Sequence, residues 1–592
     1  FDDSDLPGGD YRARLNRSVT SLNTYSVLGA NNVLLLILDD WGIDASELYN
    51  ARGPGIQLAN MPNLRGLLYS SGQITGTPDE GLLFTRGYAQ PICSPTRATI
   101  LTGRQTYQHG VGNPNPDNIL PASEETFPEI ISRAAPRYEL ASFGKWHLGS
   151  GNTGPRDRGG WPNFSGTLQG GVQDYNSWNR VKIEDGVVVD SGTSIASLLA
   201  DGVYASPYAT SVQIDEAVSF IETRGASPWV VWMGFNAPHD PFHNPPAELA
   251  PEGGFSTTGV SNRDLYVRML EALDSEIGRL LAAVDRERTN VLVVGDNGTP
   301  NQVDQAPAGG LAGAKGSLNE GGIHVPFFAA GPDIRQTGVS DTLVQVADLF
   351  TTILDLTGVD TADETRSLDL HSNSLVPIFN NTDTAERLII AEKWGLNARD
   401  GRALISDDWP QYKLVSLQDV TDPADAATYQ MYLIGEAGVE IAALTTPPAE
   451  GDLHAAAYQA LVAIDLALVP AEASTVTLQI DLPPTGISTN GQSANLPALV
   501  NAMNGNVVRP IAITVGGESA SWDNGNITRN GATTSAARVD EEGDPDPTSV
   551  VAEFDVANSG LVSGQSYPVE VSFRGGGGAS RIFTATSQFV MP

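Results

Sequence analysis

Residues 31–42 read NNVLLLILDDWG, and this stretch decides how the rest of the chain is interpreted. Six apolar residues in a row, at positions 33–38, are followed by two aspartates, a tryptophan and a glycine. A continuous apolar run bounded by turn-forming residues is typical of a strand buried on both faces, as in a parallel sheet. The segments 227–246 and 289–300 repeat the design, with SPWVVWMG and TNVLVV ahead of polar residues, Gly and Pro.

Helical patterns lie between these strand-like segments. Residues 209–225 and 261–287 carry apolar side chains at three- and four-residue spacing, which predicts amphipathic helices. Strands alternating with helices indicate an α/β domain with a mixed, mostly parallel sheet sandwiched by helices. Ligands bind at the carboxyl ends of the strands of such sheets, so we expect a site where Asp39, His239 and Asp296 follow their strands.

The pattern changes twice further along the chain. A helix is predicted over residues 341–358, then short antiparallel strands in 402–418 and 428–435, and a closing helix over 453–469. After residue 470, alternating β-branched runs separated by turn residues predict a β-sandwich. We therefore expect an N-terminal extension (1–30), a catalytic α/β domain (31–335), a smaller antiparallel α+β subdomain (336–470) and an accessory β-rich domain (471–592).

The charge of the chain excludes several classes of partner. The formal net charge of its 592 residues is −36, from 70 acidic against 34 basic side chains. Such a surface repels nucleic acid and anionic membranes, and no apolar run approaches the roughly 20 residues of a membrane span. The opening FDDSDLPGGD, without Met, predicts a mature product whose export signal has been removed, located in the periplasm or outside the cell. The acidity and the five lysines suit a salty, marine habitat or an arginine-biased genome, and both explanations stay open.

Four oxygen-bearing side chains follow two of the predicted strands. Asp39 and Asp40 follow the first strand, and Asp296 and Asn297 follow the segment at 289–295. Each pair alone is more often a turn cap that hydrogen-bonds its own backbone. Crowded carboxylates repel one another unless a cation lies between them, and Ca²⁺ takes about six to eight oxygen ligands. Two such pairs after buried strands favour a metal site.

Scarce basic residues also fall on strand ends or loops. Lys145 and His147 lie two apart and so on one side of an extended segment, His239 and His243 share a proline-rich loop, and Lys315 lies on a glycine-rich loop. Each alone is more often a solvated group, but together they indicate an anion site. We expect structural hydrogen bonding for the remaining histidines His109, His324 and His371, and an exposed position for His454.

Cys93 is the only cysteine of the chain. A spare thiol is usually a small buried hydrophobe. Here Pro95 suits a first helical position and Gly103 ends the short helix that follows, so Cys93 is expected at a positive helix end, where thiolates form readily. Arg97, one turn along the helix, can reach back to hold residue 93.

Two signatures connect these residues to a known family. CSPTRATILTG (93–103) resembles the first signature of the type I sulfatases, and YELASFGKWHLG (138–149) resembles their second. The segments LLLILDDWG, APHDPFH, VVGDNG and GAKGSLNEGGIHVPFF follow in family order, so that the resemblance covers about residues 31–470. It implies an alkaline-phosphatase-like fold and a sulfuric ester hydrolase, an arylsulfatase-like enzyme.

The resemblance also implies the roles of the site residues. Cys93 is oxidised by a formylglycine-generating or equivalent maturation enzyme to Cα-formylglycine, and Arg97 holds the modified residue. Ca²⁺, or Mg²⁺ in some members, is held by Asp39, Asp40, Asp296 and Asn297 together with modified Cys93. Substrate oxygens are bound by Lys145, His147, His239 and Lys315, and His243 is expected beside the substrate.

This chemistry gives a reason for the lone cysteine. Hydrated formylglycine is a geminal diol, and one hydroxyl can attack sulfur while the cation, Lys145 and Lys315 stabilise the charge on the oxygens. His239 protonates the departing oxygen, a role that Lys315 could share. The second hydroxyl then drives release of sulfate as the aldehyde reforms, with His147 as the base.

Two rival functions remain open at this point. A phosphate or phosphonate monoester hydrolase of the same superfamily would share the metal site. An inactive protein that binds sulfated glycans would keep Cys93 unmodified. The β-rich tail and the acidic surface favour a sulfated polysaccharide or oligosaccharide as substrate, with an aryl sulfate as a near alternative. Loops at 115–127, 151–208 and 243–255 are expected to wall the pocket and to set this specificity. The role of the β-rich tail and the oligomeric state also stay open.

Overall fold

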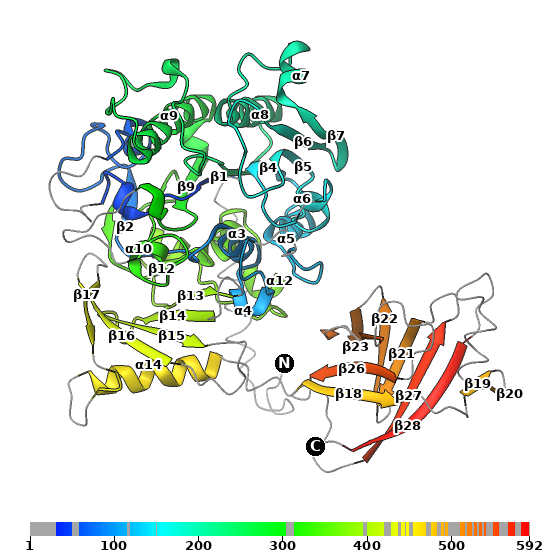
Figure 1. Cartoon of the computed structure of the whole chain (residues 1–592). Coiled ribbons are helices and arrows are strands. Elements are labelled where there is room, and N and C mark those ends of the chain that lie inside the picture. The colour runs from blue at the N-terminus through cyan, green and yellow to red at the C-terminus, as the bar shows by residue number, and fades with distance from the viewer. Residues whose placement is uncertain are drawn as a thin grey trace, which may run out of the picture. The chain divides into compact units, whose positions relative to one another are not determined.

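The computed structural model divides the chain into two compact units, Phe1–Val462 and Ala463–Pro592 (Figure 1). The predicted domain boundaries within and between these units stay predictions. The structure describes residues 31–49, 58–114, 119–149, 151–303, 313–394, 400–418, 428–435, 440–444, 446–448 and 454–468, and in the tail the backbone of the strands between 475 and 590.

A ten-stranded mixed sheet forms the centre of the first unit. Its order is β11-β2-β10-β9-β1-β8-β4-β5-β6-β7, and the run from β9 to β5 is parallel. The prediction of a mixed, mostly parallel sheet is confirmed. The strands are β1 (Asn32–Leu38), β2 (Gly81–Phe84), β4 (Glu139–Lys145), β5 (Asn163–Thr167), β6 (Asn179–Glu184), β7 (Val187–Ser194), β8 (Trp229–Gly234), β9 (Thr289–Gly295), β10 (Phe327–Ala330) and β11 (Gly338–Ser340).

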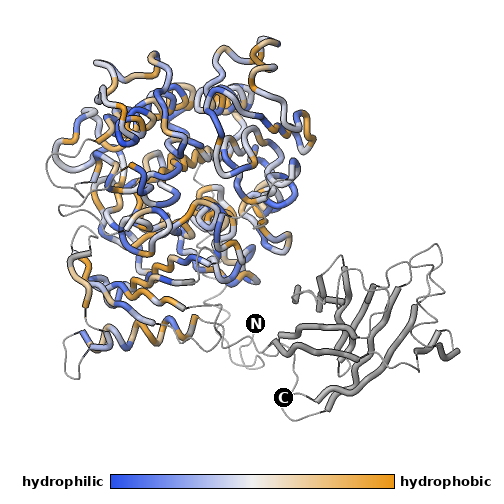
Figure 2. Tube along the Cα trace, in the orientation of Figure 1, coloured by the Kyte–Doolittle hydropathy of each residue, from blue (hydrophilic) through white to orange (hydrophobic). Residues whose placement is uncertain are grey.

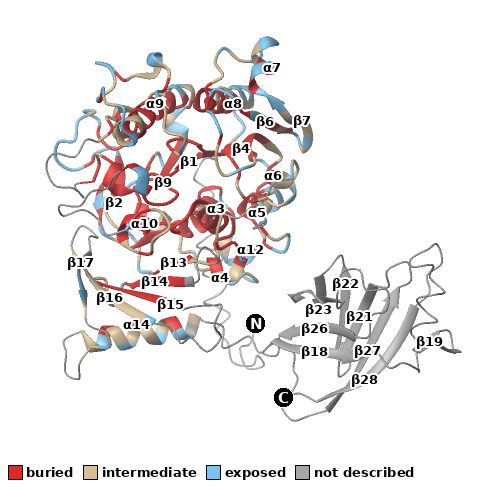
Figure 3. Ribbon diagram, viewed as in Figure 1, coloured by how far each residue is buried: buried red, intermediate tan, exposed pale blue. Residues whose placement is uncertain are grey.

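Helices cover both faces of this sheet, as the apolar run of β1 predicts. Leu34, Leu36 and Leu38 point into one apolar cluster, with α8 (Ala209–Arg224) and α9 (Asn262–Ala283). The alternate residues of β1 belong to a second cluster on the other face, with α3 (Cys93–Thr102), α5 (Phe127–Ala134) and α11 (Asp348–Leu356). Apolar segments run through the interior of this unit (Figure 2), and the same strands and helices are buried (Figure 3).

The register of the central strands brings their carboxyl ends to one edge. Leu38 of β1 pairs with Gly295 of β9, and Ile37 lies opposite Gly234 of β8. Gly234 in turn pairs with Gly144, one residue before the end of β4. The residues that follow these strands therefore meet above a single edge of the sheet.

Two predicted helix boundaries were wrong. The helix predicted over 341–358 begins only at Asp348, because Val344–Gln345 form β12, which pairs with β3 (Gly87–Tyr88). That partner lies more than 250 residues earlier, so local periodicity could not reveal it. The helix after Ile92 begins at Cys93 itself rather than at Pro95 and ends, as predicted, at Gly103, whose φ is 66°.

The smaller sheet of the first unit is antiparallel throughout, as predicted. Its strands are β13 (Leu388–Lys393), β14 (Asp400–Ser406), β15 (Tyr412–Gln418), β16 (Thr428–Ile434) and β17 (Glu440–Leu444), in that order. The closing helix α14 (Ala455–Leu468) contacts it through Tyr458, whose ring packs on Tyr429. The predicted exposed position of His454 is wrong: it is half-buried, because its ring packs on Tyr412, and its Nδ1 lies 2.8 Å from the hydroxyl of that residue.

Antiparallel strands form the described part of the tail, in agreement with the predicted β-rich domain. One sheet has the order β18-β26-β25 and the other β20-β19-β28-β27-β21-β22-β23-β24. The strands are β18 (Thr475–Asp481), β19 (Ile487–Thr489), β20 (Gln492–Ala494), β21 (Arg509–Val515), β22 (Glu518–Asp523), β23 (Asn526–Arg529), β24 (Ala532–Thr534), β25 (Arg538–Val539), β26 (Ser549–Asp555), β27 (Ser566–Arg574) and β28 (Ile582–Val590).

The remaining α-helices of the described residues are short. They are α2 (Pro62–Arg65), α4 (Thr106–His109), α6 (Gly154–Asp157), α7 (Ile195–Ala200), α10 (Glu320–Ile323), α12 (Thr361–Glu364) and α13 (Val376–Phe379).

Candidate active site

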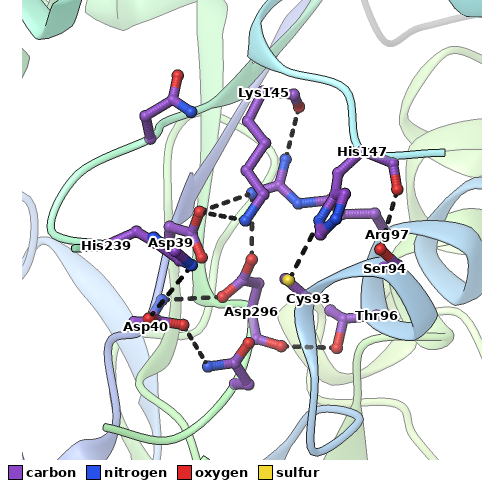
Figure 4. A network of polar contacts seen from close by, with 12 residues as sticks. Asp39, Asp40, Cys93, Ser94, Thr96, Arg97, Lys145, His147, His239 and Asp296 are labelled. Atoms are coloured by element: carbon purple, nitrogen blue, oxygen red, sulfur yellow. Dashed lines mark hydrogen bonds and ion pairs between the residues drawn. The ribbon is translucent and has the colours of Figure 1, made fainter. Parts of the chain in front are cut away.

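Acidic side chains from two neighbouring strands meet at the carboxyl edge of the sheet (Figure 4). Asp39 and Asp40 follow β1, and Asp296 and Asn297 follow β9. The backbone N–H of Asp40 donates to Oδ1 of Asp296 at 3.0 Å, and Nδ2 of Asn297 donates to Oδ1 of Asp40 at 2.8 Å. The structure thus brings together all four side chains that the sequence placed at this edge.

Donor atoms at this edge fit a divalent cation. Oδ1 of Asp39 and Oδ1 of Asn297 are buried and have no hydrogen-bond partner within the described residues. One ligand atom each of Asp39, Cys93 and Asp296 lie within 4.8 Å of one another. Buried acceptors without donors are costly, and a hard cation such as Ca²⁺ prefers carboxylate and amide oxygens. These residues therefore suit a calcium-like ion.

Burial and neighbouring charges shift the pKa values of the three carboxyl groups. Burial raises the pKa of Asp39 to about 7, although Lys145 opposes the shift. Burial and the neighbouring Asp39 raise the pKa of Asp296 to about 6. Burial acts in the same direction on Asp40, but the positive charges around it, chiefly Lys315, outweigh burial and lower its pKa. A cation among these three carboxyl groups would favour the ionised form of each of them.

Two lysines face these carboxylates. Nζ of Lys145, at the end of β4, lies 2.6 Å from Oδ2 of Asp39, and both side chains are fully buried. Nζ of Lys315 lies 2.5 Å from Oδ1 of Asp40. Each ammonium group is thus paired with a carboxylate at the strand ends.

Arg97 connects α3 to both strand ends. Its Nη2 donates to Oδ2 of Asp296 at 3.1 Å, and its Nη1 donates to the carbonyl oxygen of Lys145 at 2.7 Å. These bonds orient the buried guanidinium between the acids and β4. A bond from Arg97 to residue 93 stays a prediction.

Cys93 is the first residue of α3 and is 2% exposed. Its Sγ lies 3.3 Å from Nδ1 of His147. Burial and the charge of Lys145 hold the pKa of the His147 imidazole well below its usual value.

Two neighbours of Cys93 that the sequence patterns did not single out fix this helix end. Ser94 donates to the carbonyl oxygen of His147 at 2.9 Å, and Thr96 donates to the carbonyl oxygen of Asp296 at 2.6 Å. Their place next to Cys93 in the signature was the only available signal.

His239 reaches the acids from the loop after β8. Its Nδ1 lies 2.8 Å from the carbonyl oxygen of Asp240, which can only accept, so Nδ1 carries a proton. Its Nε2 lies 3.9 Å from Oδ2 of Asp40. The nitrogen that can exchange a proton therefore points to the carboxylate cluster.

His243 lies apart from these contacts. Its ring packs on Tyr175 with centroids 4.4 Å apart, its Nδ1 bonds the carbonyl oxygen of Pro241 and its Nε2 bonds the hydroxyl of Tyr208. Both ring nitrogens are thus engaged within the protein, and a role in binding substrate stays a prediction.

Three further histidines make hydrogen bonds within the fold, as expected. His109 bonds Thr99 at 3.1 Å and His371 bonds Gln108 at 3.1 Å. His324 lies 3.2 Å from Oε2 of Glu320. None of the three contacts the carboxylates of the site within the described part of the chain.

Known proteins resemble this chain in sequence. A family model described as Sulfatase matches residues 31–359. A protein named uncharacterized sulfatase YdeN, from Escherichia coli K12, is 25% identical over 408 residues, which cover 61% of this chain and 68% of that protein. Human N-acetylgalactosamine-6-sulfatase is 28% identical over 372 residues, covering 57% and 64%. An arylsulfatase of Hemicentrotus pulcherrimus is 28% identical over 298 residues, covering 47% and 52%.

Solved structures share the fold. The PsFucS1 sulfatase from Pseudoalteromonas sp. superposes with a TM-score of 0.55 at 21% identity, over 78% of this chain and 96% of that one. The protein Ps i-CgsB gives 0.56 at 20% identity, over 75% and 92%. The chain spans about two thirds of the length of YdeN and of human N-acetylgalactosamine-6-sulfatase. Among the helices of the described residues, none has the length and apolar character needed to cross a bilayer.

Proposed function

This chain belongs to the sulfatase family, whose members are sulfuric ester hydrolases, and on that premise we propose that it hydrolyses a sulfate monoester to an alcohol and inorganic sulfate. One observation carries the proposal. The only thiol of the chain lies at the start of a helix, with a ligand atom within 4.8 Å of those of Asp39 and Asp296 from two separate strand ends. A nucleophile beside a cation site is what attack on a sulfate ester requires.

Cys93 is proposed as the precursor of the nucleophile. Formylglycine, made from it by a maturation enzyme, supplies a geminal diol at this position, where a thiol would leave a stable adduct. The N-terminal end of α3 and Arg97 provide positive charge around residue 93. His147, whose Nδ1 lies 3.3 Å from Sγ, would take a proton from the atom that replaces sulfur.

The cation would be held by Asp39, Asp40, Asp296 and Asn297. When bound, it supplies positive charge that stabilises developing negative charge on substrate oxygens. The unpartnered oxygens of Asp39 and Asn297 support this assignment. Ca²⁺ is the ion we propose, with Mg²⁺ as the alternative.

The remaining basic residues bind and orient the sulfate group. Lys145 and Lys315 approach the acids from β4 and from the glycine-rich loop, and in the complex their ammonium groups would donate to sulfuryl oxygens. Nε2 of His239 would give a proton to the departing oxygen. His243 would contact the rest of the substrate from the rim of the site.

A sulfated sugar or an aryl sulfate is the proposed substrate class. Several relatives are named N-acetylgalactosamine-6-sulfatase and others arylsulfatase, at 28% identity. The net charge of −36 suits an enzyme that works in the periplasm or outside the cell at high ionic strength. A substrate that carries several sulfates would be attracted only near the basic side chains of the site, Lys145, Lys315 and His239.

Parallel assays test the proposal. The purified, matured protein is given 4-nitrophenyl sulfate and 4-nitrophenyl phosphate with saturating Ca²⁺, and release of sulfate from a panel of sulfated glycans is measured beside them. Peptide mass spectrometry determines whether residue 93 shows the mass loss of aldehyde formation, in which one sulfur and two hydrogens leave and one oxygen is gained. A preference for the phosphate ester, or an unmodified thiol in protein that is fully active, would contradict the proposed function.

A further inference from the structure

The segment between β5 and β6 runs past both histidines of the site. Residues 168–175, LQGGVQDY, are called the diglycine segment here. At its start the carbonyl oxygen of Leu168 accepts a hydrogen bond from the backbone N–H of His147 at 3.1 Å. This bond lies just beyond the last paired residues of β4 and β5, Lys145 and Thr167. The start of the segment is therefore attached to the backbone of His147.

The far end of the segment is attached to the loop that carries His239. Tyr175 is 1% exposed, and its hydroxyl lies 2.7 Å from the carbonyl oxygen of Asn236 and 2.8 Å from that of His239. The same Asn236 oxygen accepts the backbone N–H of His239 at 3.0 Å. Tyr175 thus holds the turn from which the His239 side chain extends.

Between these ends, Gly170 and Gly171 pack against the two imidazole rings. A Cβ atom on Gly170 would lie 2.5 Å from both Cε1 and Nε2 of His147. A Cβ atom on Gly171 would lie 3.2 Å from Nδ1 of His239. Neither glycine has a φ in the left-handed region, so their backbone conformation does not require glycine. The absence of a side chain gives room to the rings.

Each ring is thereby held on two sides. His147 has its Nδ1 edge against Cys93 and its Nε2 edge against Gly170. His239 has Nδ1 bonded to Asp240 and bordered by Gly171, which leaves Nε2 toward Asp40. Figure 4 shows the ring of His147 beside Cys93 and that of His239 beside Asp40. Proton transfer depends steeply on such placement, since a displacement of about 1 Å can cost about 100-fold in rate.

We propose that the diglycine segment is the positioning element for both active-site histidines, with Gly170 setting the ring of His147 and Gly171 together with Tyr175 setting His239. The inference rests on the proposed function, in which these two histidines move protons. Gly170, Gly171 and Tyr175 touch no reacting atom themselves and act through the imidazoles. The segment therefore governs turnover more than substrate affinity.

Four variants of the full chain test this inference: Gly170→Ala, Gly171→Ala, Tyr175→Phe and the control Gly151→Ala. Gly151 is exposed and has an ordinary φ, and no atom lies within 4 Å of the place that a Cβ would take, so alanine there changes composition without crowding. The kcat and KM of each matured variant are measured with 4-nitrophenyl sulfate. Thermal unfolding is measured in parallel, because a merely structural role would lower stability without a selective loss of kcat.

A second readout does not depend on sulfatase activity. Histidine-selective ¹H–¹⁵N NMR is recorded on the chain that retains the Cys93 thiol, and the signals of His147 and His239 are assigned with His147→Asn and His239→Asn. The chain has only seven histidines, which keeps the spectrum simple. Gly170→Ala should shift the ring signals of His147, and Gly171→Ala those of His239, while Gly151→Ala leaves both unchanged.

We expect Gly170→Ala to lower kcat about 10-fold or more with KM within about threefold, Gly171→Ala to have a smaller effect in the same direction, and Gly151→Ala to match the wild type. Unchanged ring signals together with wild-type kcat in Gly170→Ala would overturn the inference. If Gly170→Ala does not fold, Gly171→Ala and Tyr175→Phe decide through the His239 signal and kcat. If the wild type hydrolyses no sulfate ester, the proposed function fails, and the NMR shifts alone support or overturn the positioning role.

Discussion

The side-chain nitrogen of Asn297 lies 2.8 Å from Oδ1 of Asp40 and ties the residues after β9 to those after β1. The same amide has its oxygen, Oδ1, buried without a hydrogen-bond partner among the described residues, as is Oδ1 of Asp39. Buried polar atoms normally have a hydrogen-bond partner, so an amide whose nitrogen donates to a carboxylate while its oxygen has no partner requires an explanation. A cation at this point would satisfy both oxygens.

Calcium should therefore stabilise the folded chain. At a free concentration 100 times Kd, an ion that binds only the folded state adds about 2.7 kcal/mol. We expect the unfolding temperature to rise with Ca²⁺ and to fall when a chelator is added. Asn297→Ala should remove most of this response, because it deletes one ligand oxygen. An unfolding temperature that is the same with Ca²⁺ and with chelator would count against the metal site.

His239→Gln should affect substrates according to their leaving groups. Loss of a general acid costs about 10²–10⁴-fold when the departing alkoxide needs a proton. We therefore expect a loss of this size in kcat for a sugar sulfate and a clearly smaller loss for 4-nitrophenyl sulfate, whose phenolate leaves without one. Steady-state kinetics on both esters give the comparison, and equal losses would exclude His239 as the acid.

Breaking the buried ion pair between Lys413 and Glu320 should destabilise the first unit strongly. Nζ of Lys413 on β15 lies 3.0 Å from Oε1 of Glu320 on α10, and both side chains are fully buried. Lys413→Met takes the lysine partner away from the buried carboxylate of Glu320. Removal of one partner of a buried ion pair typically lowers the free energy of unfolding by about 3–5 kcal/mol. Denaturant unfolding measures the change. The control Arg366→Ala, in the exposed pair with Asp363, should change stability by less than about 1 kcal/mol.

The stability of the chain should fall in acid through His109. Burial, aided by Arg104, lowers the pKa of His109 to about 3, whereas the unfolded chain titrates near 6.5. Between these values the unfolded state binds the extra proton, so stability is full above pH 6.5 and declines as pH falls toward 3. The slope from this group is about 1.4 kcal/mol per pH unit.

His109→Gln should flatten that part of the profile. Glutamine keeps a polar partner for Thr99 but does not titrate, so the loss of stability between pH 6.5 and 4 should be smaller than in the wild type. Chemical denaturation at several pH values tests this, and identical profiles for the two proteins would contradict the assignment.

Much of the fold could be predicted because its signals are local. The apolar runs of β1, β8 and β9 identify strands that are buried on both faces, whatever their neighbours are. The carboxyl-edge rule then predicts that Asp39 and Asp296 lie together. By contrast, local periodicity predicts a helix at Val344–Gln345, because their pairing with Gly87–Tyr88 leaves no trace in it.

Residue types and their spacing establish which reactive groups the chain carries: a lone cysteine at a helix start, two acidic pairs after buried strands, and basic residues on the loops beside them. Which of these groups touch depends on the fold, as for Lys145 with Asp39 at 2.6 Å, Arg97 with Asp296 at 3.1 Å, and the bare backbone of Gly170 against the ring of His147. Residue type and short-range spacing can be seen in the sequence, whereas a hydrogen bond between residues a hundred positions apart exists only after strand register and helix packing have brought its two atoms within about 3 Å.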